Sequence, residues 1–156
     1  MGMDVVGTRP LTPSGEYFRN NVWYWRPLWD YCCSVDSTLF DKVPLAHSND
    51  GDGLDASEAR KLAFKLQEEI DSGRAEKFVN DYEAHRASLD KIPCIYCDES
   101  GNRSWPTKTG ESIKKVCNAC NGTRFTDSWE SYYPMSLENI QSFTSFLMDC
   151  GGFRIW

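Results

Sequence analysis

The sequence predicts an α+β fold: a small body of about four helices with a few short strands, interrupted by a zinc hairpin. Three observations lead to this prediction. Apolar residues recur every three or four positions in several segments, which is the spacing of amphipathic helices. Short runs near 3–6, 20–25 and 153–156 read as strands. Two Cys-x-x-Cys pairs lie in a segment, 91–125, that has few apolar residues.

The N-terminal part supplies a strand near 3–6 and then an aromatic run, YFRNNVWYWRPLWDY, over 17–31. The alternation in this run predicts a strand over about 20–25. Pro27 predicts the start of a helix that continues to about Cys33, because the missing N–H of proline has no cost in the first helical turn.

Three amphipathic helices follow. Asp55, with Glu58 three residues later, resembles a capping box and predicts a helix that ends near 72–73. A second helix is predicted from Arg74 to about Leu89. Ser136 is a plausible cap for the third, which glycines end at 151–152. We expect the last strand, 153–156, to pair with the aromatic strand and bring the chain ends together.

The four paired cysteines predict a metal site. Two thiolates separated by two residues can face one point inside a tight turn, and two such turns complete the tetrahedron that Zn²⁺ prefers. Four thiolates fill that shell, so one structural Zn²⁺ is predicted, without an open position for substrate. The alternative is that these thiols are only buried or oxidised. The ligands are Cys94, Cys97, Cys117 and Cys120.

The chain therefore divides into a helical body with the aromatic strand, 1–90 plus 126–156, and a structural zinc module, 91–125. The module is short and polar. Without metal it buries too little apolar surface to offset its ordering entropy, so we expect loss of the metal to unfold it.

The cysteine pairs, with Cys120-Asn-Gly-Thr-Arg following the second, resemble half of the cysteine-rich region of DnaJ chaperones, which repeats Cys-x-x-Cys-x-Gly-x-Gly. Glu99 and Arg124 stand where that pattern has glycines, and two pairs are present in place of four. The resemblance implies a zinc hairpin of the DnaJ or zinc-ribbon type, and no chaperone activity.

The segments GEYFRNNVWYWRPLW, NDGDGLD and GGFRIW, with the cysteine pairs, resemble a group of uncharacterised small proteins from bacteria and their phages. This resemblance implies a phage-encoded factor that acts in the host cytoplasm by binding a host protein, such as a component of a defence system. It supplies no catalytic activity.

Charge and aromatic content suggest how such a protein would act. The net charge is −6, which argues against a protein that coats nucleic acid. The segment 91–125 holds six basic and three acidic residues, so nucleic-acid binding through this segment is the second hypothesis. The leading interpretation is a non-catalytic zinc protein that binds a protein partner. The candidate partner surface comprises Trp23, Trp25, Arg26, Trp105, Lys108, Lys114, Lys115 and Arg124.

The acidic loop 49–55 allows two further hypotheses. In a calcium-binding loop Ser48 would occupy the first ligand position, and Ala59 would occupy the twelfth, where a bidentate Glu is needed. We therefore favour a turn before a helix. A metal-dependent hydrolase built on His47, Asp50 and Asp52 is the least supported function, because no catalytic sequence motif accompanies them.

The remaining cysteines, Cys32, Cys33 and Cys150, are expected to pack in the core. An odd cysteine number without an export signal fits the reducing cytoplasm. No apolar run has the roughly 20 residues of a membrane span, so no membrane association is expected.

Overall fold

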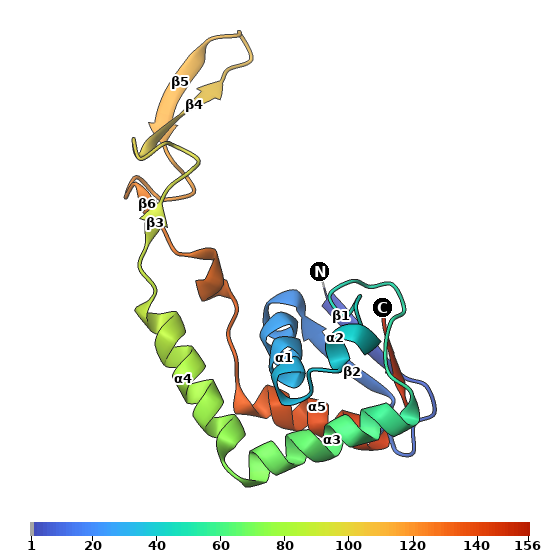
Figure 1. Ribbon diagram of the computed structural model, residues 1–156. Coiled ribbons are helices and arrows are strands. Elements are labelled where there is room, and N and C mark those ends of the chain that lie inside the picture. Colours follow the sequence, from blue (N-terminus) through green and yellow to red (C-terminus); the bar gives the residue numbers. More distant parts are fainter. Residues whose placement is uncertain (1) are drawn as a thin grey trace. The chain divides into compact units, whose positions relative to one another are not determined.

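The computed structural model describes residues 2–156 and has the predicted mixed α+β architecture. The chain forms two compact units (Figure 1). One contains the residues up to 85 together with 133–156, and the other contains 86–132. The predicted module, 91–125, lies within the second unit. The helices are α1 (Val22–Val35), α2 (Leu39–Lys42), α3 (Ala56–Asp71), α4 (Arg74–Ser88) and α5 (Leu137–Asp149).

The first unit is built on a three-stranded antiparallel sheet. The strand predicted near 3–6 is confirmed as β1 (Gly2–Gly7), and it lies between β2 (Tyr17–Asn21) and β7 (Phe153–Ile155). The expected pairing of the last strand with the aromatic strand is therefore wrong. A strand can form backbone hydrogen bonds along both of its edges, and β2 pairs with one edge of β1 while β7 pairs with the other. Figure 1 shows how β1 and β7 place the two ends of the chain together.

The aromatic segment differs from its prediction. The strand expected over 20–25 ends at Asn21, and α1 begins at Val22. The side chain of Asn21 accepts a hydrogen bond from the Tyr24 N–H at 3.0 Å and so caps the helix. Pro27 lies inside α1 rather than at its start. Residues 22–25 are all apolar, so this segment lacks the alternation of polar and apolar residues that marks a strand.

The predicted helix starts are confirmed at two places. The Asp55 side chain accepts a hydrogen bond from the Glu58 N–H at 2.9 Å, and the Ser136 hydroxyl accepts one from the Asn139 N–H at 3.2 Å. These bonds satisfy backbone donors in the first turns of α3 and α5. The helix predicted from Arg74 is α4, which ends at Ser88.

The core of the first unit is rich in aromatic rings. Trp25 lies with its ring centroid 5.5 Å from that of Trp29 and 5.6 Å from that of Phe143. Phe153 of β7 packs against Phe143 of α5 at 6.2 Å. The three other cysteines are buried in this core, as predicted: Cys32, Cys33 and Cys150.

Candidate metal centre

The four paired cysteines lie in two turns of the second unit. This unit contains two small antiparallel sheets, one of β3 (Ile92–Pro93) with β6 (Phe125–Thr126) and one of β4 (Asn102–Pro106) with β5 (Ser112–Val116). The first cysteine turn follows β3, and the second follows β5.

The two turns repeat each other's hydrogen bonding. The Cys94 N–H donates to the Arg124 carbonyl at 2.8 Å, at the end of the second turn. The Cys117 N–H donates to the Gly101 carbonyl at 2.9 Å, at the end of the first. Each turn therefore closes onto the first cysteine of the other, and this arrangement brings the two Cys-x-x-Cys pairs face to face.

Both turns contain left-handed backbone at equivalent places. After the second cysteine of each pair, the first, second and fourth residues have positive φ. These angles are 45° at Asp98 and 48° at Asn121, 57° at Glu99 and 80° at Gly122, and 74° at Gly101 and 73° at Arg124. Glu99 and Arg124, where the DnaJ pattern has glycine, thus adopt the conformation that glycine favours.

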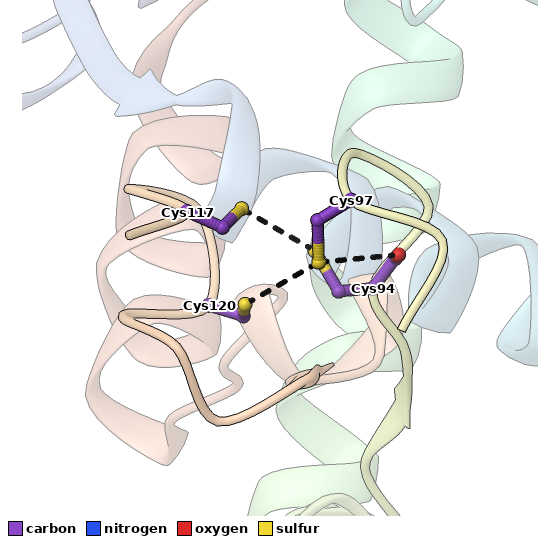
Figure 2. A group of neighbouring side chains, drawn as sticks. All are labelled: Cys94, Cys97, Cys117 and Cys120. Atoms are coloured by element: carbon purple, nitrogen blue, oxygen red, sulfur yellow. Dashed lines mark hydrogen bonds between the residues drawn. The ribbon is translucent and has the colours of Figure 1, made fainter. Parts of the chain in front are cut away.

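The four Sγ atoms converge on one point (Figure 2). All lie within 4.8 Å of one another, with 3.9 Å between Cys94 and Cys117 and 3.7 Å between Cys97 and Cys120. These separations exceed the roughly 2.05 Å of a disulfide. A tetrahedral site with metal–sulfur bonds of about 2.3 Å has sulfur–sulfur edges of about 3.8 Å. The cluster therefore has the dimensions of a four-thiolate metal site.

The cysteines also differ in acidity. Burial raises the pKa of the Cys97 thiol to about 11, and the neighbouring thiols add to this effect. At Cys117 burial acts in the same direction, but the backbone N–H groups of Cys120 and Ala119 and the nearby thiols outweigh it and lower the pKa to about 7. Thiolate is the form that binds metal, so the backbone N–H groups that lower this pKa favour the metal-binding form.

The four cysteines also form the buried core of this unit. Their exposed fractions are at most 7%, and in the described part of the unit they form a buried cluster with no aliphatic or aromatic member. Most of the large apolar side chains are instead exposed to at least 39%: Ile92, Ile95, Tyr96, Ile113, Val116, Phe125, Trp129 and Tyr132. The unit therefore lacks the hydrocarbon core that holds an ordinary domain together.

The candidate partner residues in α1 separate into buried and exposed positions. Trp25 is fully buried and donates from Nε1 to the Ala46 carbonyl at 2.8 Å, so its assignment to a partner surface is wrong. Helical geometry turns Trp25 toward the core, whereas Trp23 and Arg26 remain accessible. The Trp23 ring also lies 5.1 Å from that of Tyr133.

The other candidate partner residues belong to the second unit. Lys108, Lys114, Lys115 and Arg124 are exposed, and Trp105 is half-buried. Sequence reasoning missed Tyr96 and Arg103, although the alternation of Arg103 with Trp105 before a Thr-Gly turn indicates a hairpin. The Arg103 guanidinium lies 5.6 Å from the ring centroid of Tyr96 and 5.1 Å from that of Trp105. These contacts are within cation–π range.

The two alternative metal sites find no support among residues 2–156, where the four cysteines are the one converging group of three or more His, Cys, Asp or Glu side chains. Asp52 accepts hydrogen bonds from the N–H groups of Leu45 and Gly53 and so shapes its own loop. His47 Nε2 lies 3.5 Å from an oxygen of Asp30, on α1. The calcium loop and the His47-Asp50-Asp52 hydrolytic site are therefore not supported as metal sites.

Within the described chain, no helix is both long enough and apolar enough to cross a membrane. Comparison of the chain with protein-family models, with curated proteins and with solved structures found no match.

Proposed function

We propose that this protein is a non-catalytic binding protein whose second unit is held together by one structural Zn²⁺ and engages a protein partner. The observation that supports this proposal most is the cluster of four buried sulfurs within 4.8 Å, in a unit whose described residues form no other buried core. Zinc is the metal that best matches four thiolates at tetrahedral spacing.

The same ligand set supports a structural role for the metal. Catalytic zinc sites keep one position for water or substrate, whereas four protein thiolates leave none. Metal binding would supply the folding free energy that the missing hydrocarbon core does not.

A protein partner is favoured by what the unit exposes. Most of its large apolar side chains are on the surface, and the partner interfaces of soluble proteins are enriched in such residues, aromatics above all. We further propose that the partner is a bacterial host protein, such as a component of a defence system, as the resemblance to phage proteins implies.

Charge makes the nucleic-acid alternative weaker. The second unit, 86–132, carries seven basic and six acidic residues, a net charge of +1. Four thiolates with one divalent ion add −2, which leaves the metal-bound unit at −1. Nucleic-acid binding would appear as oligonucleotide affinity that falls steeply with salt.

The first test is the metal content of the purified protein by native mass spectrometry. We expect one Zn²⁺ per chain in the wild type and none in Cys117→Ser. Ala119→Ser is the matched control, because it adds a hydroxyl in the same turn and keeps all four thiols. Zinc retained in Cys117→Ser, or absent from the wild type, would contradict the proposed site.

The second test is affinity capture from bacterial lysate with the same three proteins. We expect one host protein to be recovered with the wild type and with Ala119→Ser, and lost with Cys117→Ser. Equal recovery with all three would show that the metal-bound unit is not the binding surface.

A further inference from the structure

The two strands of the β4–β5 hairpin form a sheet of their own, so each strand has one edge without a neighbouring strand. Two hydrogen bonds fix which backbone groups face outward. The Thr107 N–H donates to Glu111 at one end of the hairpin, and the Cys117 N–H donates to Gly101 at the other. Inward and outward positions alternate along an antiparallel pair. The N–H and C=O groups of Ser112, Lys114 and Val116 therefore point away from β4.

The outer edge of β4 is largely closed. The Asn102 N–H donates to Ser100 Oγ at 3.2 Å, and the Ser100 hydroxyl donates back to the Asn102 carbonyl at 2.8 Å. Pro106, the last residue of β4, has no N–H to offer. Ser104 is the one outward position of β4 that keeps both groups available.

The outer edge of β5 is open. No backbone bond beyond the hairpin reaches Ser112, Lys114 or Val116 in the described chain. All five residues of β5 are exposed. An open edge of this kind is the template on which an extended peptide adds as a further strand.

The charges of the hairpin are mostly basic. Arg103 stands directly opposite Lys115 in the register, and like charges in that position destabilise a strand pair. No ion pair involves Arg103, Lys108, Lys114 or Lys115 in the described structure, and Glu111 is the one acid of the hairpin. An anionic ligand beside β5 would relieve this repulsion.

We propose that the open edge of β5 binds an extended acidic segment of the protein partner as a third strand. This inference rests on the proposed function, since it names the binding site and the chemistry of the partner. The segment would pair with the outward backbone groups and place acidic side chains beside Lys114 on one face and Lys115 on the other. Ile113 and Val116, exposed to 43% and 61%, would take apolar side chains on the same two faces.

A peptide fits this edge better than a nucleic acid does. The edge presents backbone donors and acceptors in alternation, which another peptide backbone matches. A phosphate backbone offers acceptors alone, and it would face the outward carbonyls of Ser112, Lys114 and Val116 without a donor to satisfy them.

The test uses the zinc-loaded full chain and a fluorescein-labelled octapeptide of the repeat Glu-Glu-Val-Val, which presents an acid and an apolar side chain on each face of a strand. Binding is followed by fluorescence anisotropy. Three variants separate charge from backbone pairing. Lys114→Thr removes one charge, Lys114→Pro removes that charge and one outward N–H, and Ser104→Pro removes the equivalent N–H on the opposite edge.

We expect Lys114→Pro to bind the peptide about tenfold more weakly than Lys114→Thr, and Ser104→Pro to bind like the wild type. Amide hydrogen exchange gives a second readout that needs no variant. With peptide bound, the amides of Ser112, Lys114 and Val116 should gain protection, and that of Ser104 should not.

Equal affinity of Lys114→Pro and Lys114→Thr, with no added protection in β5, would overturn the proposal. So would tighter binding of an eight-nucleotide deoxythymidine strand than of the peptide. If capture from lysate succeeds while peptide binding fails, this inference is wrong and the proposed function stands. Failure of the zinc-dependent capture would instead contradict the proposed function itself.

Discussion

At the scale of single residues, each of the two cysteine turns contains a non-glycine residue whose backbone has the left-handed conformation that glycine favours. Glu99 and Arg124 hold φ values of 57° and 73° without being glycine. A side chain in the left-handed region costs about 1–2 kcal/mol. The departures from the DnaJ-like pattern noted in the sequence thus fall at positions where the backbone geometry favours glycine.

We predict that Arg124→Gly stabilises the second unit by about 1 kcal/mol, because relief of the left-handed strain exceeds the added freedom of the unfolded chain. The measurement is hydrogen exchange of the metal-bound unit under mild denaturant. Arg124→Ala is the control, because it removes the same side chain and keeps the strain. Equal stabilisation by both variants would show that φ is not the cause.

An ion pair in the first unit gives a pH prediction. Lys65 donates to Asp36 at 2.8 Å, and this bond, helped by Thr38 and opposed by burial, lowers the pKa of Asp36 to about 2. Folding lowers this pKa, so the stabilisation is present above about pH 4 and is lost as the pH falls toward 2.

We expect Asp36→Asn to lower the free energy of unfolding by about 1 kcal/mol at pH 7 and by much less at pH 2, where the carboxyl is about half protonated in the folded protein. The value at pH 7 is modest because Lys65 is half exposed. Urea unfolding at the two pH values measures this. Lys61→Gln is the control for an exposed ion pair, because Lys61 lies on α3 like Lys65 but pairs with Glu58. A loss at pH 2 as large as that at pH 7 would contradict the assignment.

At the scale of elements, the central strand depends on a close backbone approach. A Cβ at Gly7, the last residue of β1, would lie 2.0 Å from the Gly15 carbonyl oxygen and 3.0 Å from that of Cys150. Both neighbours are backbone atoms, which cannot move aside as a flexible side chain can. The packing of β1 against the loop before β2 and the end of α5 therefore requires glycine.

We predict that Gly7→Ala destabilises the first unit by about 3 kcal/mol. Gly73→Ala, between α3 and α4, should cost about 1 kcal/mol, because a Cβ there meets nothing within 4 Å and only the positive φ opposes it. Thermal unfolding followed by circular dichroism compares the two. If Gly73→Ala were the more damaging, the close approach at Gly7 would not be the controlling feature.

At the scale of the whole molecule, the two units rely on different interactions. The first unit has an aromatic and aliphatic core that includes Trp25, Phe143 and Phe153. The second has four cysteines and no buried hydrocarbon in its described residues. We therefore expect metal removal to affect the folding of the second unit and not that of the first.

We predict that a zinc chelator unfolds residues 86–132 and leaves the first unit folded, because the buried cluster of the second unit consists of the four proposed metal ligands. Hydrogen exchange with mass spectrometry would show loss of protection in β4 and β5 while α3 and α5 keep theirs. Restoration of protection by added Zn²⁺ serves as the control. A global loss of helix signal under mild chelation would refute the modular behaviour.

Local sequence signals determined much of this protein. Asp55 and Ser136 cap their helices as predicted, because a cap depends on donors only three residues away. Cys94, Cys97, Cys117 and Cys120 were identified as one site because the spacing within each pair fixes where two thiols can point.

The tertiary structure decided what depends on residues far apart in the chain. β1 separates β2 from β7 because its two edges pair with segments at opposite ends of the sequence. Trp25 is buried and Trp23 is not because α1 turns only one of them toward Phe143, more than a hundred residues away. The open edge of β5 likewise follows from the hairpin register and from the bonds that close β4. Caps and ligand spacings are local, whereas burial and strand order are set by competition among distant partners, so only the folded chain reveals them.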